Sequence, residues 1–311
     1  MTPKRRVLVV GSCIADYCLS IARMPAPGET LIASSLTHCL GGKGANQAVA
    51  LARLGEAVRF VSRVGADRHG AAFREMLVRE GIGDEGLAED PQHPTGIGIP
   101  MVLEDGTNAI VIAPSAALQL TVADVERGWP QGDGLGALLL QLEGPHDALL
   151  HAMDRARAAG IPVFLNPAPF GAFAHEALSR ADVVVPNQVE AGQLLGRAVA
   201  SVDEALEAAR ELRRHGPAVA VLTLGPQGAV VADERGAAHV PGFEITAVDT
   251  TGAGDAFCAG LVSARLRGAG WPEAVELANA CGALACLRPG TGPAMPTLER
   301  AATFLTARRG D

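Results

Sequence analysis

Positive charge is scarce in this 311-residue chain. It contains 26 Lys and Arg against 34 Asp and Glu, which gives a formal net charge of −8. A nucleic-acid-binding protein needs a basic surface to neutralise phosphates, so this balance argues against that class. No apolar run reaches the ~20 residues of a membrane span, and Val7–Val10 is too short for the apolar region of a signal peptide. We therefore expect a cytoplasmic protein without nucleic-acid or membrane partners.

Metal-binding and disulfide patterns are also missing. The six cysteines are scattered and none forms a C-x-x-C pair, so neither a zinc site nor a disulfide framework is indicated. The eight histidines show no H-x-x-x-H spacing, and none is assigned to catalysis.

Two common nucleotide-binding motifs are absent as well. The segment around Lys43 does not match the phosphate loop G-x-x-x-x-G-K-[ST], because Gly44 follows the lysine. No strand runs directly into a G-x-G-x-x-G motif, which disfavours the alternative of a nucleotide-dependent oxidoreductase.

The most informative segment that is present reads V-D-T-T-G-A-G-D-A-F, at residues 248 to 257. Gly252, Ala253 and Gly254 can expose successive backbone N–H groups at a helix start, which suits a phosphate or a developing oxyanion. Asp255 opens the helix, where a carboxylate could accept the proton of a hydroxyl that attacks phosphorus. The alternative is that Asp255 only caps the helix, since Asp is a favoured N-cap residue.

A second glycine-rich helix start lies at residues 39 to 54. Gly41, Gly42 and Gly44 predict a turn, and Lys43 and Asn46 then lie in or beside the first helical turn. They offer a cation and an amide where the backbone can approach a ligand closely. A lysine between glycines is usually part of a solvated loop, but two such helix starts together favour a ligand site.

Short apolar runs alternate with helical patterns along the chain. Strands buried on both faces are predicted at Val7–Val10, Val58–Val61, Leu138–Leu142, Val163–Leu165, Val183–Val185 and Val219–Thr223. Helices are predicted at about 44–54, 68–80, 146–159, 188–195, 202–215, 255–267 and 272–287. This order predicts a three-layer αβα sandwich around a mostly parallel, doubly wound sheet, in one domain over residues 1–311.

Two segments, at approximately 14–40 and 95–113, interrupt this alternation. Their short alternating patterns predict a small antiparallel β lid over one edge of the sheet. The alternative, that both contribute core strands to a mixed sheet, leaves the ligand site uncovered.

Two motifs carry a family resemblance. G-G-K-G-A-N-Q-A at 41 to 48 and D-T-T-G-A-G-D-A-F at 249 to 257 resemble the two signatures of the ribokinase (PfkB-type) family of carbohydrate kinases. Further matches follow in the family's order at 11–16, 25–30, 141–145, 165–169, 186–190 and 223–228. The resemblance implies the fold above and an ATP-dependent sugar kinase that converts D-ribose and ATP to D-ribose 5-phosphate and ADP. It also implies Mg²⁺ and K⁺ as cofactors and a homodimer formed through the lid.

The resemblance also assigns roles to individual residues. It implies that Asp255 is the catalytic base, and that the sugar contacts Ile14, Asp16, Gly42, Lys43, Asn46, Glu143 and Asp255. It implies nucleotide contacts from Asn187, Thr223, Leu224, Gly225, Pro226, Gln227, Gly228, Gly252, Ala253, Gly254 and Asn279. Asn187 and Glu190 would hold Mg²⁺ through water. A monovalent cation would bind mainly to carbonyl groups of Asp249, Thr251, Ala285, Arg288, Gly290 and Ala294.

Three departures from the family pattern bear on the substrate and the cation. Ala294 replaces a serine and offers no hydroxyl ligand, and P-S-A-A at 114 to 117 replaces A-G-A-N. Ile14 stands where an asparagine commonly contacts a sugar hydroxyl, so one hydrogen bond is lost. A 2-deoxyribose, another pentose or ketose, or a nucleoside tolerates Ile14 better. A non-catalytic sugar or nucleotide sensor is a further alternative, against which the intact Asp255 and Lys43 weigh.

Overall fold

The burial of β1 (Arg6–Val10) shows how the sequence forms the central sheet. The computed structural model describes residues 6–103, 108–132 and 134–309. In β1, Val7 and Val9 pack into one hydrophobic core and Leu8 and Val10 into another, and all four are fully buried. Because side chains alternate across a strand, an uninterrupted apolar run places the strand between two helical layers.

The large sheet has nine strands in the order β13-β12-β11-β10-β9-β8-β1-β4-β5. The strands from β11 to β5 in this order pair in parallel, and β12 and β13 add an antiparallel hairpin at one edge. Besides β1, they are β4 (Ala57–Gly65), β5 (Leu87–Asp90), β8 (Leu135–Gln141), β9 (Val163–Asn166), β10 (Val183–Val184), β11 (Val219–Thr223), β12 (Ala229–Asp233) and β13 (Gly236–Val240).

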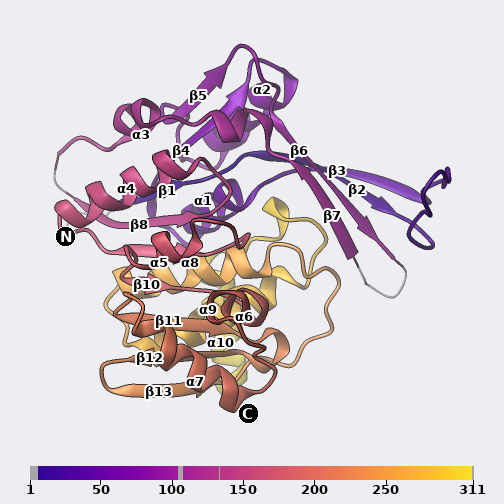
Figure 1. Ribbon diagram of the computed structural model, residues 1–311. Helices are drawn as coiled ribbons and strands as arrows, with labels where there is room; N and C mark the ends of the chain where they lie inside the picture. The colour runs from indigo at the N-terminus through magenta and orange to yellow at the C-terminus, as the bar shows by residue number, and fades with distance from the viewer. Residues whose placement is uncertain (1–5, 104–107, 133, 310–311) are drawn as a thin grey trace.

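Helices cover both faces of this sheet (Figure 1). One face carries α1 (Lys43–Arg53), α2 (Arg68–Arg79), α8 (Ala253–Leu266), α9 (Trp271–Ala285) and α10 (Leu298–Arg309). The other carries α3 (Val122–Gly128), α4 (His146–Ala158), α5 (Ala174–Leu178), α6 (Gln188–Leu195) and α7 (Val202–Arg213). The predicted three-layer αβα sandwich is confirmed. Within the described ranges, no helix has both the length and the apolar character needed to cross a bilayer.

A four-stranded sheet projects from one side of the sandwich as the lid (Figure 1). Its order is β3-β2-β6-β7, formed by β2 (Ile14–Ser20), β3 (Ser35–Gly41), β6 (Gly96–Val102) and β7 (Asn108–Ala113). The predicted antiparallel pairing holds for β2 with β3 and for β6 with β7. The two hairpins meet through β2 and β6, which pair in parallel.

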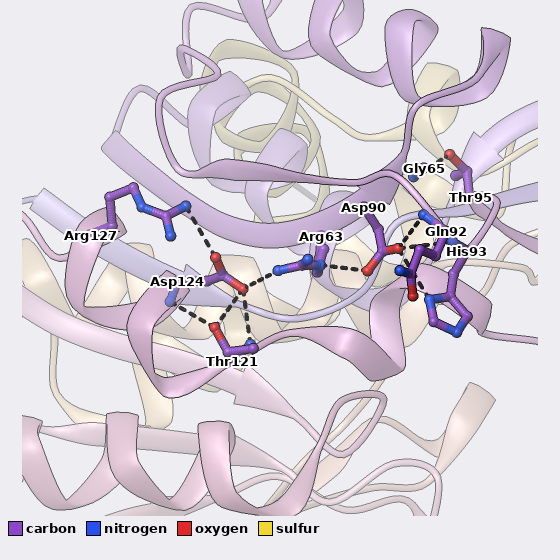
Figure 2. Close-up of polar contacts among 9 residues, drawn as sticks. All are labelled: Arg63, Gly65, Asp90, Gln92, His93, Thr95, Thr121, Asp124 and Arg127. Atoms are coloured by element: carbon purple, nitrogen blue, oxygen red, sulfur yellow. Dashed lines mark hydrogen bonds and ion pairs between the residues drawn. The ribbon is translucent and has the colours of Figure 1, made fainter.

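A buried ion network lies where the chain leaves β5 for the lid (Figure 2). Arg63 on β4 donates to Asp90 at 2.9 Å and to Asp124 at 2.8 Å. Asp124 also completes the capping box of α3 with Thr121. The Thr95 hydroxyl, just before β6, accepts the backbone N–H of residue 65 at 3.0 Å. One guanidinium thus joins β4, the end of β5 and the start of α3 at the base of the lid.

Candidate active site

The carboxyl ends of four parallel strands meet along one edge of the large sheet. Glu143 lies two residues beyond β8, and Asn166 is the last residue of β9. Asn187 follows β10 and is bridged to Thr223 at the end of β11. Ligands of open α/β sheets bind at this kind of edge, so the predicted site residues of these strands are close neighbours.

Helix α1 begins against this edge. Its N-cap is Gly42, whose φ of 88° is a backbone conformation that side-chain-bearing residues rarely adopt. The Lys43 N–H donates to Glu143 Oε2 at 2.9 Å, and the Ser12 hydroxyl donates to the same oxygen. The glutamate therefore ties the start of α1 to the end of β8.

Helix α8 begins opposite α1, and Gly252, with φ of 80°, is its N-cap. Asp255 is the third residue of the helix and makes no capping hydrogen bond, so the capping alternative does not describe it. Its Oδ2 accepts from Asn46 Nδ2 and its Oδ1 from Gln47 Nε2, both at 2.9 Å. The carboxylate is buried at the positive end of α8 and points toward α1.

Charges around this carboxylate are concentrated. Burial raises the pKa of Asp255, while Lys43 and the two amide donors lower it. Burial alone lowers the pKa of Lys43, but Asp255, Glu143 and Glu190 together raise it above its ordinary value. Lys43 is therefore a firmly charged ammonium among three carboxylates.

The lid contributes Asp16 from β2. Its carboxylate lies directly against Gly41 and Gly98, where any Cβ would collide with it. Burial raises the pKa of Asp16 to about 7, and negative charge at Cys39, Glu143 and Asp255 adds to the rise. Asp16 is thus a carboxylate that can exchange a proton near neutral pH.

Ile14 lies two residues before Asp16 on the same strand and so on the same face of the lid. It is only 2% exposed, and its Cδ1 would lie 2.6 Å from a Cβ at residue 96. Ile14 therefore occupies the Asp16 side of the lid rather than the sheet core behind Leu8 and Val9.

A cavity of about 510 Å³ opens between α8, α9 and the end of β11. Among the residues predicted to bind nucleotide, it is lined by Thr223, Gly225, Pro226, Gly228, Ala253, Gly254 and Asn279. Leu224 is instead buried in the core, and the Gln227 carbonyl accepts a hydrogen bond from His239. The apolar wall was not anticipated and comes from Phe243, Ile245, Ala283 and Cys286. Asn279 Nδ2 donates to the Val240 and Pro241 carbonyls at 3.1 Å, which joins α9 to the segment leading to Phe243.

Asn187 and Glu190, the predicted Mg²⁺ residues, form a capping box at the start of α6. Asn187 Oδ1 accepts the Glu190 N–H at 2.8 Å, and Glu190 Oε2 accepts the Asn187 N–H at 2.9 Å. Burial raises the pKa of the Glu190 carboxyl, while the backbone hydrogen bond and the Lys43 charge lower it. The pair offers amide and carboxylate oxygens, the donor type that Mg²⁺ takes together with several waters. No cluster of three or more acidic, His or Cys ligands occurs in the described part of the chain.

Asp249 organises the segment predicted to bind a monovalent cation. Its Oδ1 accepts the Thr251 N–H and its Oδ2 accepts the Gly290 N–H, both at 2.9 Å. The Cys286 carbonyl accepts the Asp249 N–H at 3.2 Å. The structure thus brings Asp249, Thr251 and Gly290 together beside α8. Ala294 is fully buried and contributes only a methyl side chain. Ala285 is the buried last residue of α9, and Arg288 follows two residues after the C-cap of that helix, Cys286.

Two buried glutamines belong to the site although sequence reasoning did not select them. Gln47 contacts Asp255, and Gln141 at the end of β8 contacts Gln47. Gln47 directly follows Asn46 in the glycine-rich motif, and Gln141 lies two residues before Glu143. That proximity to selected residues was the one available signal.

Comparison with known proteins identifies relatives that match nearly the whole chain. The model of the pfkB family carbohydrate kinases matches residues 4–298. A ribokinase of Haemophilus influenzae is 35% identical over 302 residues, covering 97% of this chain and 99% of that protein. A deoxyribokinase of Salmonella typhi is 32% identical, covering 96% and 98%. The solved Arabidopsis thaliana ribokinase, complexed with ribose and ATP, has a TM-score of 0.85 at 29% identity, covering 97% and 99%.

Proposed function

The chain belongs to the pfkB family of carbohydrate kinases, and we propose that it phosphorylates D-ribose with ATP, forming D-ribose 5-phosphate and ADP. One observation supports this most directly. Asp255 is a buried carboxylate at a helix start, with the sugar-loop residue Asn46 on one side and the cavity-lining Gly254 next to it in the chain. A base in this position lies between the two predicted substrates.

The chain's own residues supply three effects in this reaction. Asp255 accepts the proton of the attacking sugar hydroxyl. Backbone N–H groups at Gly252 to Gly254 stabilise negative charge on the transferring phosphoryl group, since the first turn of a helix leaves its donors without intrahelical acceptors. Lys43, charged and half-buried, adds a cation beside the same carboxylates.

The sugar is held from two sides in this proposal. Asp16 on the lid and Glu143 on the sandwich supply carboxylates for its hydroxyls, and the backbone at Gly42 approaches it closely. Asp16 lies on the lid sheet and Glu143 lies at the edge of the large sheet. Closure of the lid therefore brings these two groups together and excludes water that would otherwise hydrolyse ATP.

Cations are part of the proposal. Asn187 and Glu190 hold Mg²⁺ through water, and that ion neutralises phosphate charge when bound. A K⁺ ion belongs near Asp249, where the carboxylate orders the surrounding carbonyl groups.

The second candidate substrate is 2-deoxyribose, and Ile14 favours it. An isoleucine on the Asp16 face of the lid offers no partner to one sugar hydroxyl, and the deoxyribokinase of Salmonella typhi is about as similar to this chain as several ribokinases are. A coupled assay of ADP release across ribose, 2-deoxyribose, other pentoses, ketohexoses and nucleosides decides between them. Sugar binding without ADP release by the wild-type protein would instead indicate a sensor.

The enzyme acts as a homodimer in this proposal, in the cytoplasm where ATP is available. The support is β7, an edge strand of the lid that leaves Ile110, Val111 and Ile112 exposed by 49%, 59% and 44%. An exposed apolar edge strand invites pairing with another chain, and a second lid supplies one.

The assignment of Asp255 is tested by Asp255→Asn. The amide keeps the size but lacks basicity, and its NH₂ cannot accept one of the two hydrogen bonds that Asn46 and Gln47 donate to the carboxylate. We expect kcat to fall by ~10²–10⁴-fold. Sugar and ATP affinity, measured by isothermal titration, stay near those of the wild type. An Asn variant with wild-type kcat would show that Asp255 is not the base.

A further inference from the structure

A chain of amide side chains, one half-buried and two fully buried, leads from the backbone to the Asp255 carboxylate. Asn166 Nδ2 donates to the Val185 carbonyl at 3.0 Å, and Asn166 Oδ1 accepts from Gln47 Nε2 at 3.3 Å. The same Gln47 Nε2 donates to Asp255 Oδ1 at 2.9 Å. Gln47 Oε1 accepts from Nε2 of Gln141, and both glutamines are fully buried. The four side chains come from α1, α8, β8 and β9.

This sequence of hydrogen bonds leaves each amide with one favourable orientation. A carbonyl only accepts, so Asn166 turns its NH₂ to Val185 and its oxygen to Gln47. Gln47 must then direct its NH₂ at Asn166 and Asp255, which places its oxygen at the NH₂ of Gln141. A flipped Gln47 would direct its oxygen at two other oxygens and leave a buried amide unpaired, at a substantial cost.

We propose that Gln47 and Gln141 are positioning residues that hold the Asp255 carboxylate in the orientation in which it accepts the proton of the sugar hydroxyl. Asn46 fixes Oδ2, and Gln47 fixes Oδ1. With one donor the carboxylate could rotate about its terminal bond; with two it has a defined plane. Gln141 bonds to Gln47 rather than to Asp255. It acts by keeping the Gln47 NH₂ turned toward Asp255. The inference rests on the proposed role of Asp255 as base.

Gln47 also affects how easily Asp255 is protonated. A hydrogen bond to the charged form lowers a carboxyl pKa, so removal of the Gln47 donor raises the pKa of Asp255. The other groups that face Asp255 are Lys43 on α1, Glu143 beyond β8, Asp16 on β2 and Cys258 on α8. None of these four groups is changed in the experiment below. A shift in the pH dependence of kcat therefore reports on the loss of the Gln47 amide.

The test is the pH profile of kcat for Gln47→Met and Gln141→Met. Methionine has nearly the shape of glutamine but cannot donate. We expect the acidic limb of the Gln47→Met profile to move up by about 1 pH unit, because the lost bond was to a charged group. Gln141→Met should move it in the same direction by less. KM for sugar and for ATP should stay within about twofold, since neither glutamine is assigned a ligand contact.

Ser62→Ala provides the control, because Ser62 is a fully buried polar residue outside this amide chain. It should leave the pH profile in place, whatever its effect on the melting temperature. If Gln47→Met lowers the melting temperature but leaves the acidic limb in place, the glutamines only fill space and the proposal is wrong. Asp255→Asn separates this failure from failure of the proposed function: turnover retained in Asp255→Asn overturns both. Turnover lost there, with an unmoved limb in Gln47→Met, overturns only the positioning role.

Discussion

At the scale of a single residue, the charged Asp16 carboxylate is proposed to bind the sugar but lowers the stability of the folded protein. Its carboxylate is enclosed by Gly41 and Gly98, and Glu143 and Asp255 are nearby. Burial, which disfavours the charged form, is the largest reason that its pKa rises to about 7. The folded protein therefore binds a proton at Asp16 at pH values where the unfolded chain has lost it.

The sign of the resulting pH dependence follows from this shift. A raised carboxyl pKa makes the folded state lose stability as pH increases from the ordinary value near 4 toward 7. Asp16→Asn removes that loss, so we expect the unliganded variant to melt higher than the wild type at pH 8, by roughly 2–4 °C per kcal/mol regained. The advantage should largely vanish at pH 4. Thermal melts at both pH values measure it, and the expected accompanying cost is a lower kcat/KM for sugar.

Ile14 gives a second prediction at this scale. Since it faces the Asp16 side of the lid, Ile14→Asn supplies a polar partner for one sugar hydroxyl. We expect kcat/KM for ribose relative to 2-deoxyribose to rise ~10-fold, about one hydrogen bond in a closed site. The competing possibility is that the asparagine is buried without a partner. An unchanged ratio together with a clear drop in melting temperature would falsify the specificity role.

The residues that sequence reasoning missed share a physical cause. Gln47 and Asp255 are 208 residues apart, and only the packing of α1 against α8 brings them together. The neighbouring residues in the sequence do not distinguish a buried glutamine from an exposed one. A single sequence also does not reveal its hydrogen-bond partner. Lys43 and Asn46 were selected because glycines beside them mark a close backbone approach, which is a local property.

At the scale of elements, most strands of the parallel sheet could be predicted because they are buried on both faces, but the short edge strand β5 was not predicted. All six predicted apolar runs fall on β1, β4, β8, β9, β10 and β11. The hairpin of β12 and β13 was not predicted. Its segments A-V-V-A-D and G-A-A-H-V are rich in alanine, which has little strand preference. Pairing of β12 with β11 and of β13 with β12 determines their conformation. Helix α8 begins at Ala253 rather than Asp255, because Gly252 takes the N-cap position.

The junction between sandwich and lid gives a prediction about elements. Arg63 is the shared partner of Asp90 and Asp124, whose side chains are only 6% and 3% exposed. Arg63→Met leaves Asp90 without a guanidinium and leaves Asp124 with only that of the exposed Arg127. Breaking a buried pair in this way is strongly destabilising. We expect the melting temperature to fall by roughly 5–10 °C.

Arg59→Met on the same strand is the matched control. Arg59 pairs with Glu85, whose side chain is 68% exposed, and exposed ion pairs contribute little. Its melting temperature should change by about 2 °C or less. Equal losses in the two variants would mean that the network in Figure 2 has no special role at the base of the lid.

At the scale of the whole molecule, the lid sheet projects away from the sandwich (Figure 1). Strand β7 lies at its edge, with Ile110, Val111 and Ile112 exposed and with one row of backbone groups unpaired by the lid sheet itself. Because successive side chains point to opposite faces, both faces of this strand are apolar. A chain that presents such an edge has to cover it or aggregate, and covering by a second lid also restricts how each lid moves over its own site.

This reasoning predicts that Val111→Asp separates the subunits. We expect the wild type to sediment near twice the 31.9 kDa of one chain and Val111→Asp to sediment as a single chain, because a carboxylate in the apolar contact must lose its water. Val78→Asp is the control, since Val78 on α2 is exposed to a similar extent, 61%, and lies outside the lid. It should remain a dimer. A wild type that sediments as one chain would show that another surface covers β7, whereas a dimeric Val111→Asp would place the interface elsewhere on the molecule.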